Sequence, residues 1–60
     1  MRFKVGDMVC HEYNKSRVGY VTKMEGRPKR YIYIRWFEES FDMWYCIDSG
    51  TIYKSLIKVS

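Results

Sequence analysis

The chain has little of what a membrane protein or a metalloprotein needs. It contains no apolar run near the ~20 residues that span a bilayer, so we expect no membrane role. It has two cysteines and one histidine, which is fewer ligands than an isolated structural zinc site normally takes. Cys10 and His11 are also neighbours on a predicted strand and would point to opposite faces. We therefore expect neither a metal nor another cofactor.

A catalytic motif is missing as well. Cys10, His11 and the acids Glu38, Glu39 and Asp42 supply a nucleophile, a base and carboxylates, but no pattern places them together. A chain of 60 residues makes one domain, and a barrel of that size fills its interior with its own side chains. We expect a single non-catalytic domain over residues 1–60.

The start of the chain and its thiols indicate a compartment. Residues 1–5 run directly into a folded pattern and show no signal peptide. Cys10 and Cys46 are then expected to be thiols in a reducing compartment, although a disulfide between them is geometrically possible. We expect the protein in the cytoplasm.

What is present is a series of short strands between turn signals. Turn residues gather at 6–7, 14–16, 26–28 and 48–50. Between them, β-branched and aromatic residues predict strands at 8–11, 18–24, 30–37, 41–46 and 56–59, with one helical or 3₁₀ turn in 49–55. Five short strands at this spacing favour a small all-β barrel, which also removes exposed sheet edges.

The third predicted strand alternates most clearly. Its core face is expected to hold Ile32, Ile34 and Trp36, and its outer face Tyr31, Tyr33 and Arg35. The fourth predicted strand carries apolar residues on both faces, so its orientation stays open. One of its faces is a candidate contact surface. The turn between these two strands holds Glu38 and Glu39, which we expect to pair with Arg30 or Arg35.

The segment Val5-Gly6-Asp7-Met8-Val9, followed by Val18-Gly19-Tyr20-Val21, resembles the Gly-Asp-x-Val then Gly-x-Val pattern of KOW and Tudor-like SH3 barrels. The match covers the first third of the chain and implies a five-stranded SH3-like barrel. Ser16-Arg17 stands where nucleic-acid-binding KOW proteins carry a glycine.

The pattern has a physical basis. Gly6 allows a tight entry to the first strand, Asp7 can bond local backbone, and Gly19 permits a close strand approach. Val9 and Val21 are then expected to face the core.

A second resemblance rests on Arg35-Trp36-Phe37, Trp44-Tyr45 and the closing Lys58-Val59-Ser60. These segments are similar to small uncharacterised proteins encoded by tailed bacteriophages. The resemblance implies a viral protein of the host cytoplasm or of the virion.

A basic and aromatic surface is the first candidate site. The net charge of +4 favours anionic partners, and rings beside cations hold single-stranded nucleic acid in other small barrels. The candidate nucleic-acid-binding residues are Arg17, Lys23, Arg27, Lys29, Arg30, Tyr31, Tyr33 and Arg35. Gly26-Arg27-Pro28 also resembles the core of an AT-hook, but glycine and proline are ordinary turn residues, so we expect a hairpin loop with basic flanks here.

An excess of apolar residues is the second candidate site. A five-stranded barrel cannot bury all of Phe37, Ile52 and the aromatic and Met residues of the fourth strand, and exposed groups of this kind mark protein interfaces. The candidate protein-interaction residues are Phe41, Met43, Trp44, Tyr45 and Tyr53.

These two surfaces give two functional hypotheses. Because small barrels are mostly adaptors, we predict a protein-interaction module, either a virion accessory subunit or a modulator of a host protein. The alternative is a nucleic-acid-binding protein. The sequence leaves the partner and the oligomeric state open.

Overall fold

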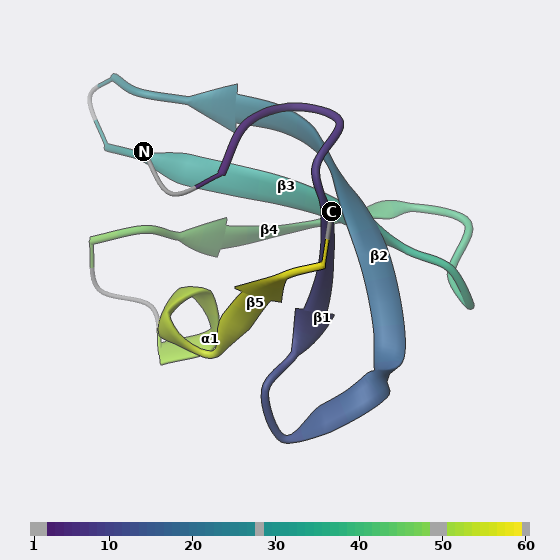
Figure 1. The fold of residues 1–60 in the computed structure, drawn as a ribbon. Coiled ribbons are helices and arrows are strands. Elements are labelled where there is room, and N and C mark those ends of the chain that lie inside the picture. The colour runs from purple at the N-terminus through teal and green to yellow at the C-terminus, as the bar shows by residue number, and fades with distance from the viewer. Residues whose placement is uncertain (1–2, 28, 49–50, 60) are drawn as a thin grey trace.

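Over the residues that it describes, the computed structural model has five antiparallel strands and one short helix (Figure 1). It describes residues 3–27, 29–48 and 51–59. The elements are β1 (Met8–His11), β2 (Asn14–Glu25), β3 (Tyr31–Trp36), β4 (Asp42–Cys46), α1 (Thr51–Lys54) and β5 (Leu56–Lys58). The strands form one sheet in the order β4-β3-β2-β1-β5. The predicted all-β fold of five strands is confirmed, with a curved sheet that does not close because β4 and β5 are its two ends.

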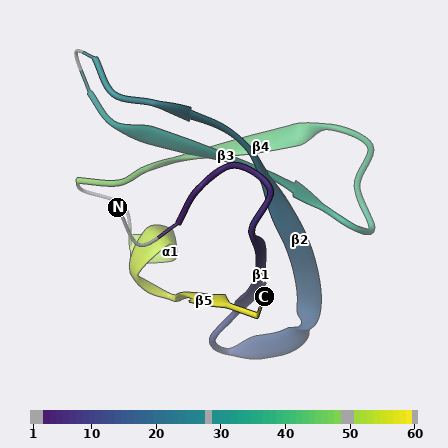
Figure 2. The ribbon, with the colours of Figure 1, turned by 45° about the horizontal axis from the view of Figure 1, so that its top comes forward.

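Strand β2 is longer than predicted and gives the sheet its curvature. Its first part pairs with β1 and its second part with β3, with an irregularity between Val21 and Lys23 (Figures 1 and 2). Residues 14–16, expected as a turn, instead begin this strand. The turn between β1 and β2 consists of residues 12–13, because His11 pairs with Asn14.

The Gly-Asp and Gly-x-Val segments behave as their chemistry predicts. Gly6 has a φ of +96°, which the glycine backbone adopts without strain. The Asp7 carboxylate accepts a hydrogen bond from the Lys4 N–H at 3.0 Å. A Cβ on Gly19 would lie 2.7 Å from the carbonyl oxygen of Arg35, so a side chain here would collide with β3.

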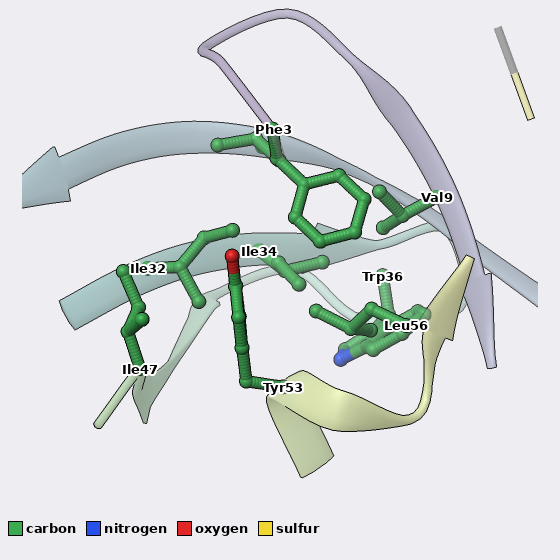
Figure 3. Packing of buried hydrophobic residues seen from close by; sticks show 9 residues of the cluster. Phe3, Val9, Ile32, Ile34, Trp36, Ile47, Tyr53 and Leu56 are labelled. Atoms are coloured by element: carbon green, nitrogen blue, oxygen red, sulfur yellow. The ribbon is translucent and has the colours of Figure 1, made fainter. Parts of the chain in front are cut away.

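The core lies on the concave side of the curved sheet (Figure 3). Strand β3 alternates as predicted, with Ile32, Ile34 and Trp36 fully buried, and Val9 and Val21 face the core. The Trp36 indole N–H donates to the Tyr45 hydroxyl at 2.9 Å, which satisfies a buried donor. The complete cluster comprises Phe3, Val9, Val21, Ile32, Ile34, Trp36, Ile47, Tyr53 and Leu56.

Helix α1 closes the core from one side. Residues 51–54 form one α-helical turn, and the rings of Tyr53 and Phe3 meet edge to face with centroids 5.6 Å apart. Ser49 and Gly50, which belong to the predicted turn, lie outside the described residues. Within the described ranges, no helix has the length and apolarity to cross a bilayer.

A candidate ligand-binding hollow on strands β3 and β4

Three aromatic side chains line an open hollow of about 240 Å³ on the outer face of the sheet. Tyr31 and Tyr33 lie two residues apart on β3, so both point to this face, as the alternation predicted. Trp44 comes from β4, where it pairs with Tyr33 in the strand register. Its side chain is 60% exposed, so the indole offers a large accessible surface.

Trp44 links two surfaces that were predicted separately from the sequence. Tyr31 and Tyr33 were assigned to a nucleic-acid surface, whereas Trp44 was assigned to a protein interface. The register places Tyr33 opposite Trp44, and residues opposite each other in a sheet share a face. The three rings therefore form one site, which we call the aromatic hollow.

The Glu25 carboxylate forms a hydrogen bond with Tyr33, one of the residues that line the aromatic hollow. The Tyr33 hydroxyl donates a 2.6 Å hydrogen bond to Glu25, and the Lys23 ammonium lies 3.5 Å from the other Glu25 oxygen. The bond from Tyr33 lowers the pKa of Glu25 below its usual value, with the Lys23 charge acting in the same direction. The same bond raises the pKa of Tyr33. Glu25 thus orients the Tyr33 ring, although no sequence pattern had assigned it to a site.

Three of the predicted cations near the hollow are already paired. Lys23 is neutralised by Glu25 and lies 5.4 Å from the centre of the Tyr33 ring. Arg30 bonds Asp48 through Nε at 3.0 Å, and Arg35 bonds Asp42 through Nε at 2.7 Å.

The pairing with Asp48 shifts both titrating groups. The hydrogen bond and the opposite charge lower the pKa of Asp48 and raise that of Arg30. The positive charge of the paired cations on this face is therefore largely compensated.

Arg27 and Lys29 differ from these paired cations. Both lie exposed in the hairpin between β2 and β3, and neither has an ion-pair partner within the described ranges. This hairpin leads directly into Tyr31, the first residue of β3. Uncompensated positive charge therefore lies in the hairpin that leads to the first residue of the hollow. Pro28, the third residue of the predicted Gly-Arg-Pro turn, lies outside the described residues.

Arg17, another of the candidate nucleic-acid-binding residues, does not line the aromatic hollow. Its guanidinium contacts Glu38, lies 3.6 Å from Glu39 and sits 4.5 Å from the centre of the Trp36 ring. The expected pairing of Glu38 and Glu39 with Arg30 or Arg35 is therefore wrong. The loop after β3 turns back toward β2, where the Phe37 N–H donates to the Val18 carbonyl, and this brings both acids to Arg17.

The predicted protein-interaction residues separate in the structure. Phe41 and Met43 are exposed, whereas Tyr45 is half-buried against the core and Tyr53 is buried within it. Trp44 alone joins the aromatic hollow. The group predicted from its apolar character is thus partly core and partly surface.

The two cysteines lie on different parts of the sheet. Cys10 is buried on β1 and Cys46 is half-buried on β4, and both are thiols. Strands β2 and β3 separate their strands in the sheet order. Within residues 3–27, 29–48 and 51–59, no three His, Cys, Asp or Glu residues cluster as metal ligands would.

Comparisons with known proteins add no relative to these observations. No protein-family model matches the chain. Searches of curated proteins and of solved structures also find no match. Any assignment of function therefore rests on the geometry of this chain.

Proposed function

We propose that this protein is a non-catalytic module that binds single-stranded nucleic acid at the aromatic hollow. The observation that carries the proposal is the position of three aromatic rings on one face of the sheet, with two uncompensated cations, Arg27 and Lys29, in the hairpin that leads into the first of them. Proteins that bind single strands combine these two elements, because every base has a face that stacks on a ring and every linkage carries a negative phosphate.

The form of the hollow favours single strands over duplexes. The lining is aromatic, formed by Tyr31, Tyr33 and Trp44, so its main contact with a base is stacking. In a duplex the base faces are already stacked on their neighbours, whereas single strands present them to a protein. A hollow of about 240 Å³ is a place for a splayed base and is not a groove for a helix.

The charge distribution limits the number of phosphates that the site engages. Lys23, Arg30 and Arg35 keep acidic partners, so Arg27 and Lys29 supply the contacts to phosphate. Binding should therefore weaken with salt, but with the small dependence of a site that neutralises two phosphates. Stacking supplies the remaining affinity.

Fluorescence anisotropy with labelled oligonucleotides tests the proposal. Purified protein is titrated into single-stranded and duplex DNA and RNA at low and at physiological salt. We expect binding of single strands that persists at physiological salt and exceeds binding of the duplexes. Binding seen only at low salt, or equal binding of single strands and duplexes, would contradict the proposal.

A second candidate function is the protein-interaction adaptor that the sequence favours, of the virion or of the host cell. It is supported by a separate exposed group: Phe37 is 60% and Phe41 is 52% exposed, and Phe37 contacts Tyr20 with centroids 6.2 Å apart. Clustered exposed aromatic residues are typical of interface centres. We expect Phe37→Ala and Phe41→Ala to abolish the capture of a partner while nucleic-acid binding is kept, and capture by both variants would exclude this group.

A further inference from the structure

Strand β2 brings a carboxylate and an ammonium group to the side of the aromatic hollow. In the register of β2 and β3, Glu25 is opposite Tyr31 and Lys23 is opposite Tyr33. Residues opposite each other in a sheet share a face, so both charged side chains lie on the face that carries the lining rings. The aromatic hollow therefore has charged hydrogen-bonding groups next to it on its β2 side.

The Glu25 carboxylate lies at the end of one lining ring and keeps capacity for further hydrogen bonds. Its Oε1 atom accepts the 2.6 Å bond from the Tyr33 hydroxyl, and its Oε2 atom lies 3.5 Å from the Lys23 ammonium. An ionised carboxylate has about four lone-pair sites on its two oxygens. Each oxygen can therefore accept a further bond, and 40% of the Glu25 side chain is exposed to receive one.

The charge state of the pair determines which groups a ligand must offer. The bond from Tyr33 lowers the pKa of Glu25, so the carboxylate is ionised at neutral pH and can only accept hydrogen bonds. The Lys23 ammonium has donors and no acceptor. A base on the aromatic hollow thus meets two acceptor oxygens, with a donor 3.5 Å from one of them.

Guanine is the base whose edge complements these groups. Its Watson–Crick edge carries two neighbouring donors, the N2 amino group and the N1–H, followed by the O6 acceptor. Adenine, cytosine and thymine each present a single donor group on that edge, together with acceptors that a carboxylate repels. Single-stranded nucleic acid leaves this edge free for a protein to contact.

We propose that the aromatic hollow prefers guanine, with Glu25 accepting from the N1 and N2 donors and Lys23 donating to O6 while the rings stack on the base. The inference rests on the proposed function and names the base that the site selects. A bidentate contact of this kind discriminates against another base by about 5- to 150-fold.

Stacking without edge contacts would give a different order of affinities. Sequence preferences that come from stacking alone are modest and follow the stacking strength of each base. Guanine and adenine are both purines with faces of similar size, so a site that only stacks would bind them alike. The comparison of guanine with adenine therefore isolates the contribution of Glu25 and Lys23.

Strands that differ at one base test the inference. Thymidine oligonucleotides of one length carry guanine, adenine, cytosine or hypoxanthine at the central position, and anisotropy measures their binding to the natural chain at physiological salt. We expect guanine to bind at least about fivefold more tightly than adenine or cytosine. Hypoxanthine keeps N1–H and O6 but lacks the N2 amino group, so it should lose part of this advantage.

The variant Glu25→Gln tests the carboxylate itself. The amide keeps an oxygen that can accept from Tyr33, but its NH₂ group is a donor and meets the donors of guanine. We expect the ratio of guanine to adenine affinity to fall to near unity. The ratio is the measurement because the lost negative charge alters the binding of every strand alike. The control Glu12→Gln removes the same charge from an exposed residue of the β1–β2 turn and should leave the ratio unchanged.

The outcomes separate this inference from the proposed function. Equal binding of the guanine and adenine strands, or a Glu25→Gln variant that keeps the natural ratio, would overturn the guanine preference and leave single-strand binding intact. No binding of any strand would overturn both. Should Glu25→Gln fail to fold, the natural chain still decides, since hypoxanthine bound as tightly as guanine would contradict the contact with N2.

Discussion

The rings of Tyr31 and Trp44 meet edge to face, with centroids 5.3 Å apart and planes at 89°. The contact runs diagonally across β3 and β4, because Tyr31 is opposite Cys46 and Trp44 is opposite Tyr33. Edge-to-face pairs contribute about 0.5–1.5 kcal/mol beyond the area they bury. The contact therefore holds the aromatic hollow in shape before a ligand arrives, which reduces the entropy lost on binding.

Removing the indole should impair binding while sparing the fold. For Trp44→Ala we expect single-stranded nucleic acid to bind about 5- to 150-fold more weakly, the loss that corresponds to one base stacked on a ring. The free energy of unfolding should fall by only about 0.5–1.5 kcal/mol, the contribution of the lost ring contact with Tyr31, because most of Trp44 is exposed. Phe37→Ala is the matched control, since Phe37 is equally exposed but lies outside the hollow. Equal losses in both variants, measured by anisotropy, would argue against the hollow.

The hairpin cations should set the salt dependence of binding. Replacing both Arg27 and Lys29 with serine removes two phosphate contacts, and the slope of log K against log salt should fall in magnitude by about 1.4. The control pair Lys15→Ser and Lys54→Ser removes the same charge from exposed sites on β2 and α1. If both pairs change the slope alike, the effect is one of net charge and the hairpin has no special role.

The sequence predicted the fold well because the strand signals were local. The alternation of β3 and the glycines at positions 6 and 19 each identified a feature that the structure contains. The beginning of β2 was missed, because Asn14 and Ser16 are ordinary turn residues. In the folded chain Asn14 instead accepts bonds from the backbone and hydroxyl of Ser16 within the strand.

The site was harder to predict, because it depends on the register between β3 and β4. A turn centred on Glu39 would have placed Tyr45 opposite Tyr33, whereas the structure places Trp44 there. A shift of one residue moves every side chain of a strand to the other face. No residue pattern in β4 resolves the register, since both of its faces are apolar.

The ion pairs also depend on residues that are distant in the sequence. Arg17 pairs with Glu38 because the loop after β3 folds back toward β2.

The Glu25 carboxylate should control the titration of Tyr33. In Glu25→Gln the negative charge is lost, so the pKa of Tyr33 should fall toward its usual value of 10.0. NMR titration of the tyrosine ring carbons in the natural chain and in Glu25→Gln would show this shift. An unchanged Tyr33 titration would show that the bond to Glu25 is absent in solution.

The hydrogen bond between Tyr33 and Glu25 also makes the stability of the fold depend on pH. The folded-state pKa of Glu25 is lowered from 4.5, so its contribution is present above that value and is lost as pH falls through the folded-state pKa. The pKa of Tyr33 is raised, so its contribution is present below pH 10.0 and is lost as pH rises through the folded-state pKa. Urea unfolding should therefore show the difference between the natural chain and Glu25→Gln narrowing at both extremes.

Gly19 should tolerate no side chain. A Cβ at this position would lie 2.7 Å from a backbone oxygen of β3, which cannot move aside without disturbing the sheet. For Gly19→Ala we expect a loss of about 1–3 kcal/mol in the free energy of unfolding. Gly26→Ala is the control, since a Cβ on Gly26 would meet no atom within 4 Å and the φ of Gly26 is not positive; it should be neutral or slightly stabilising. Equal stability of the two variants in urea would contradict the close approach of β2 and β3.

The aromatic hollow as a binding site is tested most directly by NMR titration of the ¹⁵N-labelled chain with a short single-stranded oligonucleotide at physiological salt. The two tryptophans give separate indole signals, since Trp44 is largely exposed and Trp36 is fully buried. We expect the largest shifts at the Trp44 indole and at the backbone amides of Arg27, Lys29 and Tyr31, with little change at the Trp36 indole. Shifts confined to Phe37 and Phe41, or no shifts at all, would contradict the account.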